Sequence, residues 1–409
     1  MENRPRGLDD ARIFALLKDL WGIYEGSLIF DLPTPVRVPS GEGAGGSDAA
    51  CGVVSSIELR GLESYDDFNA HVVVRVGDEA RMEYVFKATM LHTRQRLELQ
   101  TEVMTLLNAA GLPCPAVVPS VHGRHIERAD GLTTDGTAAA DECNGKKHRP
   151  TLVRLLTYLP GKVLPLQHHR SRTMLINLGR LAGRVSAALE GYEHPASEWD
   201  WEWNIATLIA TCRPRVRYEQ QAHRRELATL ILDEFERVVC PRLSSLRQSV
   251  AHTDLNDTNL LWAGDECCGV LDFGDVIHTA TCFEVGICAG YHCIAQPDPW
   301  EAALTIIQSY DEGYPLTDDE IEVLPLVVQA RILMSALNSI YYQTLEPDNE
   351  YLSHTHEPGW RTLEQLGARL EIRARGQEVA VDELKRRLKA SRGGLTYIGL
   401  VLRLAGTTE

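Results

Sequence analysis

The chain has 409 residues, of which 44% are hydrophobic, 24% charged and 7% aromatic. This composition is typical of a globular protein and excludes a wholly disordered or collagen-like chain. Lys and Arg number 41 against 57 Asp and Glu, which gives a formal net charge of −16. A broad nucleic-acid-binding surface would form against this negative field, so we expect no nucleic-acid partner. A small phosphate ligand is compatible with it, because a metal ion and a few cations neutralise phosphate locally.

Cysteine spacing and hydropathy indicate the cellular compartment. The ten cysteines form no pair of Cys-x-x-Cys clusters, so we expect reduced thiols in the core and no zinc site. The N-terminus carries acidic residues where a secretory leader needs an apolar run. The most apolar later stretch contains Gln329 and Arg331, which argues against a membrane-spanning segment. We therefore expect a cytoplasmic protein without a membrane partner.

A helix, a loop and a β-meander are predicted at the start of the chain. Residues 8–22 place apolar side chains at helical spacing, whereas residues 33–52 are rich in Pro, Gly, Ala and Ser and predict a loop. Three runs of β-branched and aromatic residues then predict antiparallel strands at 55–61, 70–77 and 82–89.

A second helix is predicted over 97–111, followed by an extended connector to another strand. The polar tract 123–150 predicts an insertion, after which residues 151–161 return to what we expect to be a five-stranded sheet. The remaining pattern is helical apart from one hairpin near residues 260–273. The whole pattern predicts an α+β protein in which a small β-rich lobe precedes a larger helical lobe.

The most specific stretch is SVAHTDLNDTNLLW followed by CCGVLDFGD, which holds His252, Asp254, Asn259 and Asp272 in that order. Phosphoryl transfer needs a carboxylate that orients the acceptor hydroxyl and takes its proton, and a divalent metal for the phosphate oxygens. We assign Asp254 to the first task, and Asn259 and Asp272 to Mg²⁺. A hairpin between them would carry both metal ligands side by side, and His252 would brace the loop. Asp and Asn also serve surface turns, but four such residues in this order favour the catalytic interpretation.

We expect a positively charged side chain to bind the phosphates of the nucleotide. Lys87 lies on an apolar strand, and the helix that follows carries Glu98 and Glu102. A Lys–Glu pair fixes such a side chain over a nucleotide, with Glu98 as first choice and Glu102 as substitute. The alternative is a solvated lysine at a sheet edge.

The turn between the first two predicted strands is a candidate to cover the phosphates. Its Ser64 and Asn69 can donate hydrogen bonds to a phosphate, although the aspartates between them would repel one unless they face a cation. The alternative is an ordinary hairpin turn. The glycine-rich residues 41–46 formally satisfy G-x-G-x-x-G, but they follow no strand and open no helix, so we reject them.

These motifs resemble the aminoglycoside and choline phosphotransferase-like kinases and, within them, the hydroxylysine kinases. The resemblance runs from about residue 59 to 370 and rests on LESYDDFNAHVVV, EYVFKAT, HTDLNDTNLL and GVLDFGD, among other segments. It implies a two-lobed protein-kinase-like fold, with a lead-in over 1–32, an N-lobe over 33–158 and a C-lobe over 159–409. The same resemblance gives Asp254, Asn259, Asp272 and Lys87 the roles described above.

The resemblance also implies a nucleotide and an acceptor. Thr157, Tyr158 and Leu159 would form the hinge against which the purine lies. Hydroxylysine kinases use GTP to phosphorylate the side-chain hydroxyl of 5-hydroxy-L-lysine, so Mg²⁺, GTP (or ATP) and an amino-alcohol substrate are expected. The chain departs from the superfamily at Thr253, where a glycine usually separates the His from the Asp and where β-branching restricts the backbone.

An amino-alcohol acceptor carries ammonium groups, so its pocket should offer carboxylates. Asp275, Asp257 and Glu284 are the candidates, and tryptophans 199, 201 and 203 could face an ammonium, although alternate tryptophans more often serve packing. A kinase for ethanolamine, choline, homoserine or an aminoglycoside is the nearest rival, and a catalytically silent scaffold is the rival of another class. A protein kinase is disfavoured, because no A-P-E segment follows DFGD.

Overall fold

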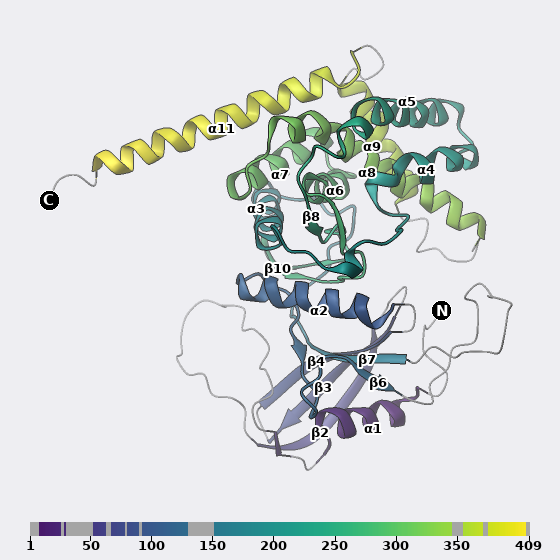
Figure 1. Ribbon diagram of the computed structural model, residues 1–409, viewed down its shortest axis with the longest axis vertical. Coiled ribbons are helices and arrows are strands. Elements are labelled where there is room, and N and C mark those ends of the chain that lie inside the picture. Colours follow the sequence, from purple (N-terminus) through teal and green to yellow (C-terminus); the bar gives the residue numbers. More distant parts are fainter. Residues whose placement is uncertain are drawn as a thin grey trace. The chain divides into compact units, whose positions relative to one another are not determined.

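The structure of the chain is a computed structural model that describes residues 8–25, 28–29, 52–62, 67–77, 80–89, 92–129, 151–345, 355–370 and 375–405. The chain forms two compact units, residues 1–160 and 161–409 (Figure 1). The first unit is rich in β-structure and the second is mainly helical. The predicted α+β class is therefore confirmed.

The first unit is built on one antiparallel sheet. Its helices are α1 (Asp10–Trp21) and α2 (Arg94–Ala109), and its strands are β1 (Leu28–Ile29), β2 (Gly52–Leu62), β3 (Phe68–Val76), β4 (Ala80–Thr89), β5 (Val117–Val118), β6 (Glu127–Ala129) and β7 (Thr151–Thr157). The predicted meander is present as β2-β3-β4, but the described sheet has seven strands instead of five. The difference lies among β1, β5 and β6, whose two or three residues are too short to show a periodic pattern.

The helix α1 begins and ends at the signals in its sequence. The Asp9 side chain accepts a hydrogen bond of 2.7 Å from the backbone N–H of Arg12, and Gly22 ends the helix in the left-handed conformation with φ 66°. The apolar side of α1 packs on the sheet, where Trp21 lies edge-on to Phe86 with ring centroids 6.3 Å apart.

The helix α2 lies on the face of the sheet that α1 does not cover. Strand register decides which side chains lie on that face. Lys87 of β4 is directly across from Asn69 of β3 and from Arg154 of β7, so the three share that face. Leu152, two residues before Arg154, clusters there with Leu97 of α2. The predicted phosphate-binding lysine and Asn69 therefore belong to one row of the sheet.

The second unit combines helices with two short strand pairs. Its α-helices are α3 (Arg172–Ala188), α4 (Leu208–Cys212), α5 (Ala222–Val238), α6 (Cys282–Cys293), α7 (Pro299–Gly313), α8 (Asp318–Leu345), α9 (His356–Arg369) and α11 (Glu378–Ala405). Short 3-10 helices are η1 (Pro195–Ser197), η2 (Ile205–Thr207), η3 (Arg213–Tyr218) and η4 (Cys240–Arg242). The strands are β8 (Gln248–Ala251), β9 (Leu260–Ala263), β10 (Glu266–Val270) and β11 (Ile277–Ala280), paired antiparallel as β9-β10 and β8-β11.

The predicted hairpin is present as β9-β10, whereas the β8-β11 pair was not predicted. Each strand of that pair has four residues, and their partners lie 25 or more residues apart, so local pattern does not reveal them. The pair matters for function because β8 leads directly into the HTDLNDTN segment and β11 follows DFGD.

The helix α8 is long and apolar enough to cross a membrane by length and composition alone. However, 94% of its most apolar window is buried, and it packs against α5, α6 and α9 (Figure 1). In this structure α8 is thus the central core helix of its unit. Six of the eight cysteines that the structure describes are buried, in keeping with the core thiols that the sequence predicts.

Candidate active site

The catalytic loop begins where β8 ends, and His252 anchors it. The imidazole is fully buried, lies edge-on to Phe273, and donates from Nε2 to the carbonyl of Leu271 at 3.0 Å. Its Nδ1 accepts a hydrogen bond of 3.3 Å from the backbone N–H of Asp254. Burial lowers the pKa of His252 to about 4, so the ring is neutral at pH 7 and fits the bracing role expected for it.

Thr253 has a left-handed backbone, with φ 60°, which is costly for a β-branched residue. Its hydroxyl donates to the carbonyl of Asp275 at 2.9 Å. One oxygen of the buried Glu284 accepts the backbone N–H groups of both His252 and Thr253, at 2.6 and 3.3 Å. The strained turn that a glycine would form freely is therefore held by a carboxylate from α6.

Asp254 lies at the centre of a hydrogen-bonded cluster. Its Oδ2 accepts from the amides of Asn259 at 2.6 Å and Asn256 at 3.0 Å, and its Oδ1 accepts from Arg331 at 3.1 Å. Burial raises the pKa of the Asp254 carboxyl, the Arg331 cation lowers it, and the nearby charge of Asp272 raises it again, with a net upward shift. The environment thus fixes the orientation of Asp254 and makes its carboxylate a stronger base.

The β9-β10 hairpin places Asn259 beside the DFGD segment. Val270 pairs with Leu260, and the backbone N–H of Leu271 donates to the carbonyl of Asn259 at 2.8 Å. Asp272, the next residue, also has a left-handed backbone, with φ 53°. The structure therefore brings Asp254, Asn259 and Asp272 together, as the hairpin interpretation requires.

Mg²⁺ fits this set of donors by charge and by ligand type. Burial raises the pKa of Asp275 well above its usual range, and the charges of Asp254 and Asp272 raise it further, so three carboxylates repel one another here. A divalent cation would relieve this repulsion, and the amide oxygen of Asn259 is an oxygen donor of the type Mg²⁺ prefers. Among the described residues no set of three or more His, Cys, Asp or Glu side chains is arranged to hold a metal ion. In sites of this kind Mg²⁺ keeps several waters and binds phosphate oxygens, which would supply the rest of its ligands.

Comparison with known proteins agrees with this geometry. Residues 66–319 match the APH family, described as the phosphotransferase enzyme family. The chain belongs to the phosphotransferase enzyme family. It is 31% identical to hydroxylysine kinase of Mus musculus, over 76% of this chain and 84% of that protein. It is 28% identical to homoserine kinase of Methylobacillus flagellatus, over 73% of this chain and 84% of that protein.

Solved structures confirm the kinase-like fold. The structure of a microcompartment-associated aminopropanol kinase aligns with a TM-score of 0.54 at 18% identity, over 79% of this chain and 94% of that one. The predicted two-lobed fold class is thereby confirmed. The family match and the likeness to hydroxylysine kinase confirm the predicted phosphotransferase with an alcohol acceptor. This phosphotransferase is a small-molecule kinase.

In the first unit of this phosphotransferase, Lys87 forms an ion pair with Asp67 and not with the predicted Glu98. The Nζ of Lys87 lies 3.3 Å from Oδ2 of Asp67, and both side chains are largely buried. The reason is the register, because Asn69 is directly opposite Lys87 and Asp67 lies two residues before it on the same face. One of the two aspartates in the turn thus faces a cation, whereas Ser64 lies outside the described residues.

The predicted hinge of the phosphotransferase follows β7. Thr157 exchanges two hydrogen bonds of 2.9 Å with the backbone of Ala116, and the backbone N–H of Tyr158 donates to Glu83 at 3.1 Å. The ring of Tyr158 stacks on His71 with centroids 4.1 Å apart, and Leu159 is 5% exposed. This segment is therefore firmly attached to the sheet, as a purine platform requires.

The three carboxylates predicted to bind the acceptor have different surroundings. Asp275 is half-buried beside Asp254 and so remains a candidate. Asp257 is buried near Arg170. Burial lowers the pKa of the Arg170 guanidinium, and the charge of Asp257 opposes this effect. Glu284 is completely buried and faces the loop backbone, so its position is that of a support for the loop and not of an acceptor ligand.

Sequence reasoning missed Arg331 as a site residue. This side chain of α8 is 1% exposed and donates to Asp254, to the hydroxyl of Tyr291 at 2.7 Å and to the carbonyl of Trp203 at 3.1 Å. The ring of Trp203, one of the three tryptophans considered either for an ammonium or for packing, faces the Arg331 guanidinium at 5.2 Å. The signal was a charge inside an apolar helix, which indicates a buried partner.

Proposed function

We propose that this enzyme transfers the γ-phosphate of GTP or ATP to the hydroxyl of 5-hydroxy-L-lysine. The observation that carries the proposal is the Asp254 carboxylate, oriented by Asn259 and Arg331 beside Asp272. The likeness to hydroxylysine kinase of Mus musculus supports the choice of acceptor.

We infer a role for each residue, and the geometry supports these roles. Asp254 would hold the acceptor hydroxyl and accept its proton as the phosphate is transferred. Asn259 and Asp272 would hold Mg²⁺, which when bound neutralises charge on the phosphate oxygens. Burial and neighbouring charges raise the pKa of Asp275, and an ammonium group beside its carboxyl would lower that pKa again. We therefore assign this residue to the acceptor side of the site.

In the first unit, Lys87 is the cation that we propose for the phosphates. Asn69 lies beside it in the same row of the sheet, and we keep Ser64 as a second phosphate donor. Residues Thr157–Leu159 are the proposed purine platform, with backbone groups as the natural partners of a base.

A second acceptor is favoured by one observation, the 28% identity to homoserine kinase of Methylobacillus flagellatus. Homoserine shares the α-amino acid group and a side-chain hydroxyl with hydroxylysine but lacks the second ammonium.

We also propose a cytoplasmic enzyme with small-molecule substrates and no nucleic-acid or membrane partner, which the net charge of −16 and the burial of α8 support.

The test is a transfer assay with purified protein and a panel of amino alcohols. The panel contains 5-hydroxy-L-lysine, homoserine, ethanolamine and choline, each with Mg·GTP and with Mg·ATP. We expect the highest kcat/KM with 5-hydroxy-L-lysine, and a loss of about 100-fold or more for Asp254→Asn, which keeps the size of the side chain but not its basicity. Transfer to homoserine alone, or equal rates in the Asp254→Asn control, would contradict the proposal.

A further inference from the structure

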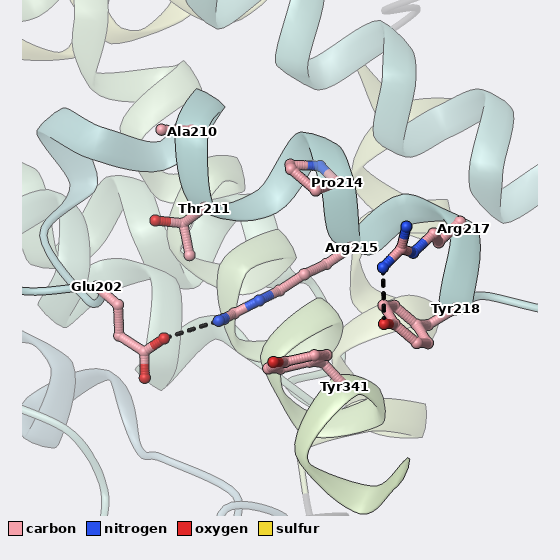
Figure 2. Close-up of a pocket in the computed structure, with 8 residues that line it drawn as sticks. All are labelled: Glu202, Ala210, Thr211, Pro214, Arg215, Arg217, Tyr218 and Tyr341. Atoms are coloured by element: carbon pink, nitrogen blue, oxygen red, sulfur yellow. Dashed lines mark hydrogen bonds and ion pairs between the residues drawn. The ribbon is translucent and has the colours of Figure 1, made fainter. Parts of the chain in front are cut away.

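A pocket of the helical unit lies outside the cluster around Asp254. It has a volume of about 300 Å³, within the range of small-molecule sites, and lies among α4, η3, the C-terminal part of α8 and the segment that precedes η2. Figure 2 shows Glu202 and Arg215 pointing toward each other across it, with the ring of Tyr341 beneath the guanidinium. The walls of the pocket therefore carry both signs of charge.

The charged groups of the pocket are one carboxylate and two guanidiniums. Glu202 and Arg215 form an ion pair of 2.7 Å, and the guanidinium of Arg215 lies 4.3 Å from the ring centroid of Tyr341. Arg217 lies over the ring of Tyr218 at 4.9 Å and donates to its hydroxyl at 3.0 Å. The net charge of this wall is +1, so it suits a ligand that brings both a carboxylate and an ammonium.

A buried amide beside the pocket has unused hydrogen-bonding capacity. The Oδ1 of Asn338 accepts from Arg215, and the side chain is 0% exposed. Its Nδ2 has no hydrogen-bond partner in the part of the chain that the structure describes. A buried N–H group without a partner is unfavourable, and a ligand carboxylate held by Arg215 would offer it an acceptor.

The pocket is connected to the catalytic carboxylate through Arg331. This residue donates to Asp254 at 3.1 Å and to the carbonyl of Trp203, the neighbour of Glu202 in the chain. Asn338 lies seven residues after Arg331 on the same helix, which places it on the same face about 10 Å along the axis. One face of α8 therefore contacts both places, Asp254 through Arg331 and Arg215 of the pocket through Asn338.

We propose that this pocket binds the α-amino acid head group of the acceptor, and the inference rests on the proposed function. The carboxylate would bind Arg215 and Arg217, and the α-ammonium would bind Glu202 and the face of Tyr341. In the free enzyme Glu202 and Arg215 neutralise each other. A bound zwitterion would give each of the two side chains a new partner of opposite charge, so neither would be left unpaired. A ligand with an ammonium alone leaves Arg215 without its carboxylate, so the pocket discriminates against simple amines.

The size of the acceptor agrees with this placement. Five bonds separate the 5-hydroxyl oxygen of hydroxylysine from its carboxylate carbon, a span of roughly 6 Å when extended, and a hydrogen bond adds about 2.8 Å at each end. The sum, about 12 Å, is comparable with the rise of about 10 Å along α8 between Arg331, which binds Asp254, and Asn338, which binds Arg215. Ethanolamine and choline carry no carboxylate and reach no second charged site.

The test compares 5-hydroxy-L-lysine with its decarboxylated analogue, an amino alcohol of the same length without the carboxylate. We expect Arg215→Met to raise KM for hydroxylysine about tenfold or more and to cause no rise in KM for the analogue, whose ammonium would no longer compete with Arg215 for Glu202. The matched control is Arg213→Met on the same 3-10 helix, whose side chain pairs with Asp233 and Glu236. It should leave KM for hydroxylysine unchanged.

A binding measurement gives a readout that does not depend on turnover. L-Lysine should raise the thermal midpoint of the wild-type protein, cadaverine should raise it less, and Arg217→Met should remove most of the difference. This second variant keeps the test valid if Arg215→Met does not fold. Equal loss for both acceptors, or an unchanged preference for lysine over cadaverine in folded Arg215→Met and Arg217→Met, overturns the inference. Absence of phosphate transfer to every amino alcohol, with lysine binding intact, would instead contradict the proposed function.

Discussion

Arg331 of α8 donates a hydrogen bond of 3.1 Å to the carboxylate of Asp254, although 77 residues separate the two in the chain. The guanidinium is 1% exposed and has further partners in Tyr291 and Trp203. A buried cation beside the proposed catalytic base opposes the effect of burial, which by itself would keep the carboxyl protonated. The core helix of this unit thereby acts on the protonation state of the active site.

Replacement of Arg331 should move the acid limb of the pH profile. The proposed base, Asp254, would act as a carboxylate. Loss of the cation raises its pKa, so Arg331→Met should shift the acid limb of kcat/KM upward by about one unit or more. Arg331→Lys keeps the charge and should shift it less. Identical acid limbs in the two variants, measured with the proposed acceptor, would show that the charge of Arg331 does not act on Asp254.

The ion pair between Lys87 and Asp67 makes a prediction that separates two possible partners. Asp67→Asn should raise KM for the nucleotide by about fivefold, or about 1 kcal/mol, because Lys87 loses the group that orients it. Glu98→Gln, at the residue that the sequence suggested as partner, should leave KM unchanged. The opposite order of effects in nucleotide kinetics would restore Glu98 as the functional partner.

Sequence reasoning predicted which candidate site residues lie together where their spacing is local. Asp254, Asn259 and Asp272 lie within 19 residues of one another, and a turn between two short apolar runs was enough to predict their convergence. The large elements of the first unit were predictable for the same reason, since α1 and the β2-β3-β4 meander carry periodic patterns and turn residues of their own.

The contacts that sequence reasoning did not predict depend on tertiary structure. The choice of Asp67 over Glu98 follows from strand register, which no spacing along the helix reveals. Glu284 was expected to bind an acceptor, yet it supports Thr253 because α6 packs it beneath the loop. Arg331 gave a visible signal, a charge within an apolar run, but the identity of its partner required the fold.

Thr253 allows a test of backbone strain in the catalytic loop. At φ 60° a glycine carries no steric penalty, whereas a β-branched residue costs about 1–3 kcal/mol, here offset in part by the hydroxyl that donates to Asp275. Thr253→Val keeps the strain and loses the hydrogen bond, so it should be the less stable variant. Thr253→Gly should lie within about 1 kcal/mol of the wild type in free energy of unfolding and keep most of the activity.

Chemical denaturation of the two variants at one pH measures this difference. The Gly variant also tests the departure from the superfamily, because it restores the residue that usually stands at this position. A Val variant as stable as the Gly variant would mean that the left-handed backbone stores no strain.

His292 should make the stability of the enzyme depend on pH in a defined direction. Burial and the Arg170 cation lower its pKa, a hydrogen bond from Nε2 to the carbonyl of Leu255 at 3.2 Å raises it, and the net result is a pKa of about 3. Below pH 6.5 the unfolded chain binds a proton at this position that the folded chain does not bind. Stability is therefore lost as pH falls from about 6.5 toward 3, by about 1.4 kcal/mol between pH 7.5 and 5.5.

His292→Gln keeps a donor for Leu255 but does not titrate, so its free energy of unfolding should fall less over this interval than that of the wild type. The exposed His122, replaced in the same way, is the matched control and should retain the wild-type slope. Because His252 is buried and neutral as well, the His292 variant should keep part of the acid sensitivity, and the double variant with His252→Gln should lose more of it. Parallel pH profiles for His292→Gln and the wild type would show that His292 has the same pKa in the folded and the unfolded chain and that its burial has no such effect.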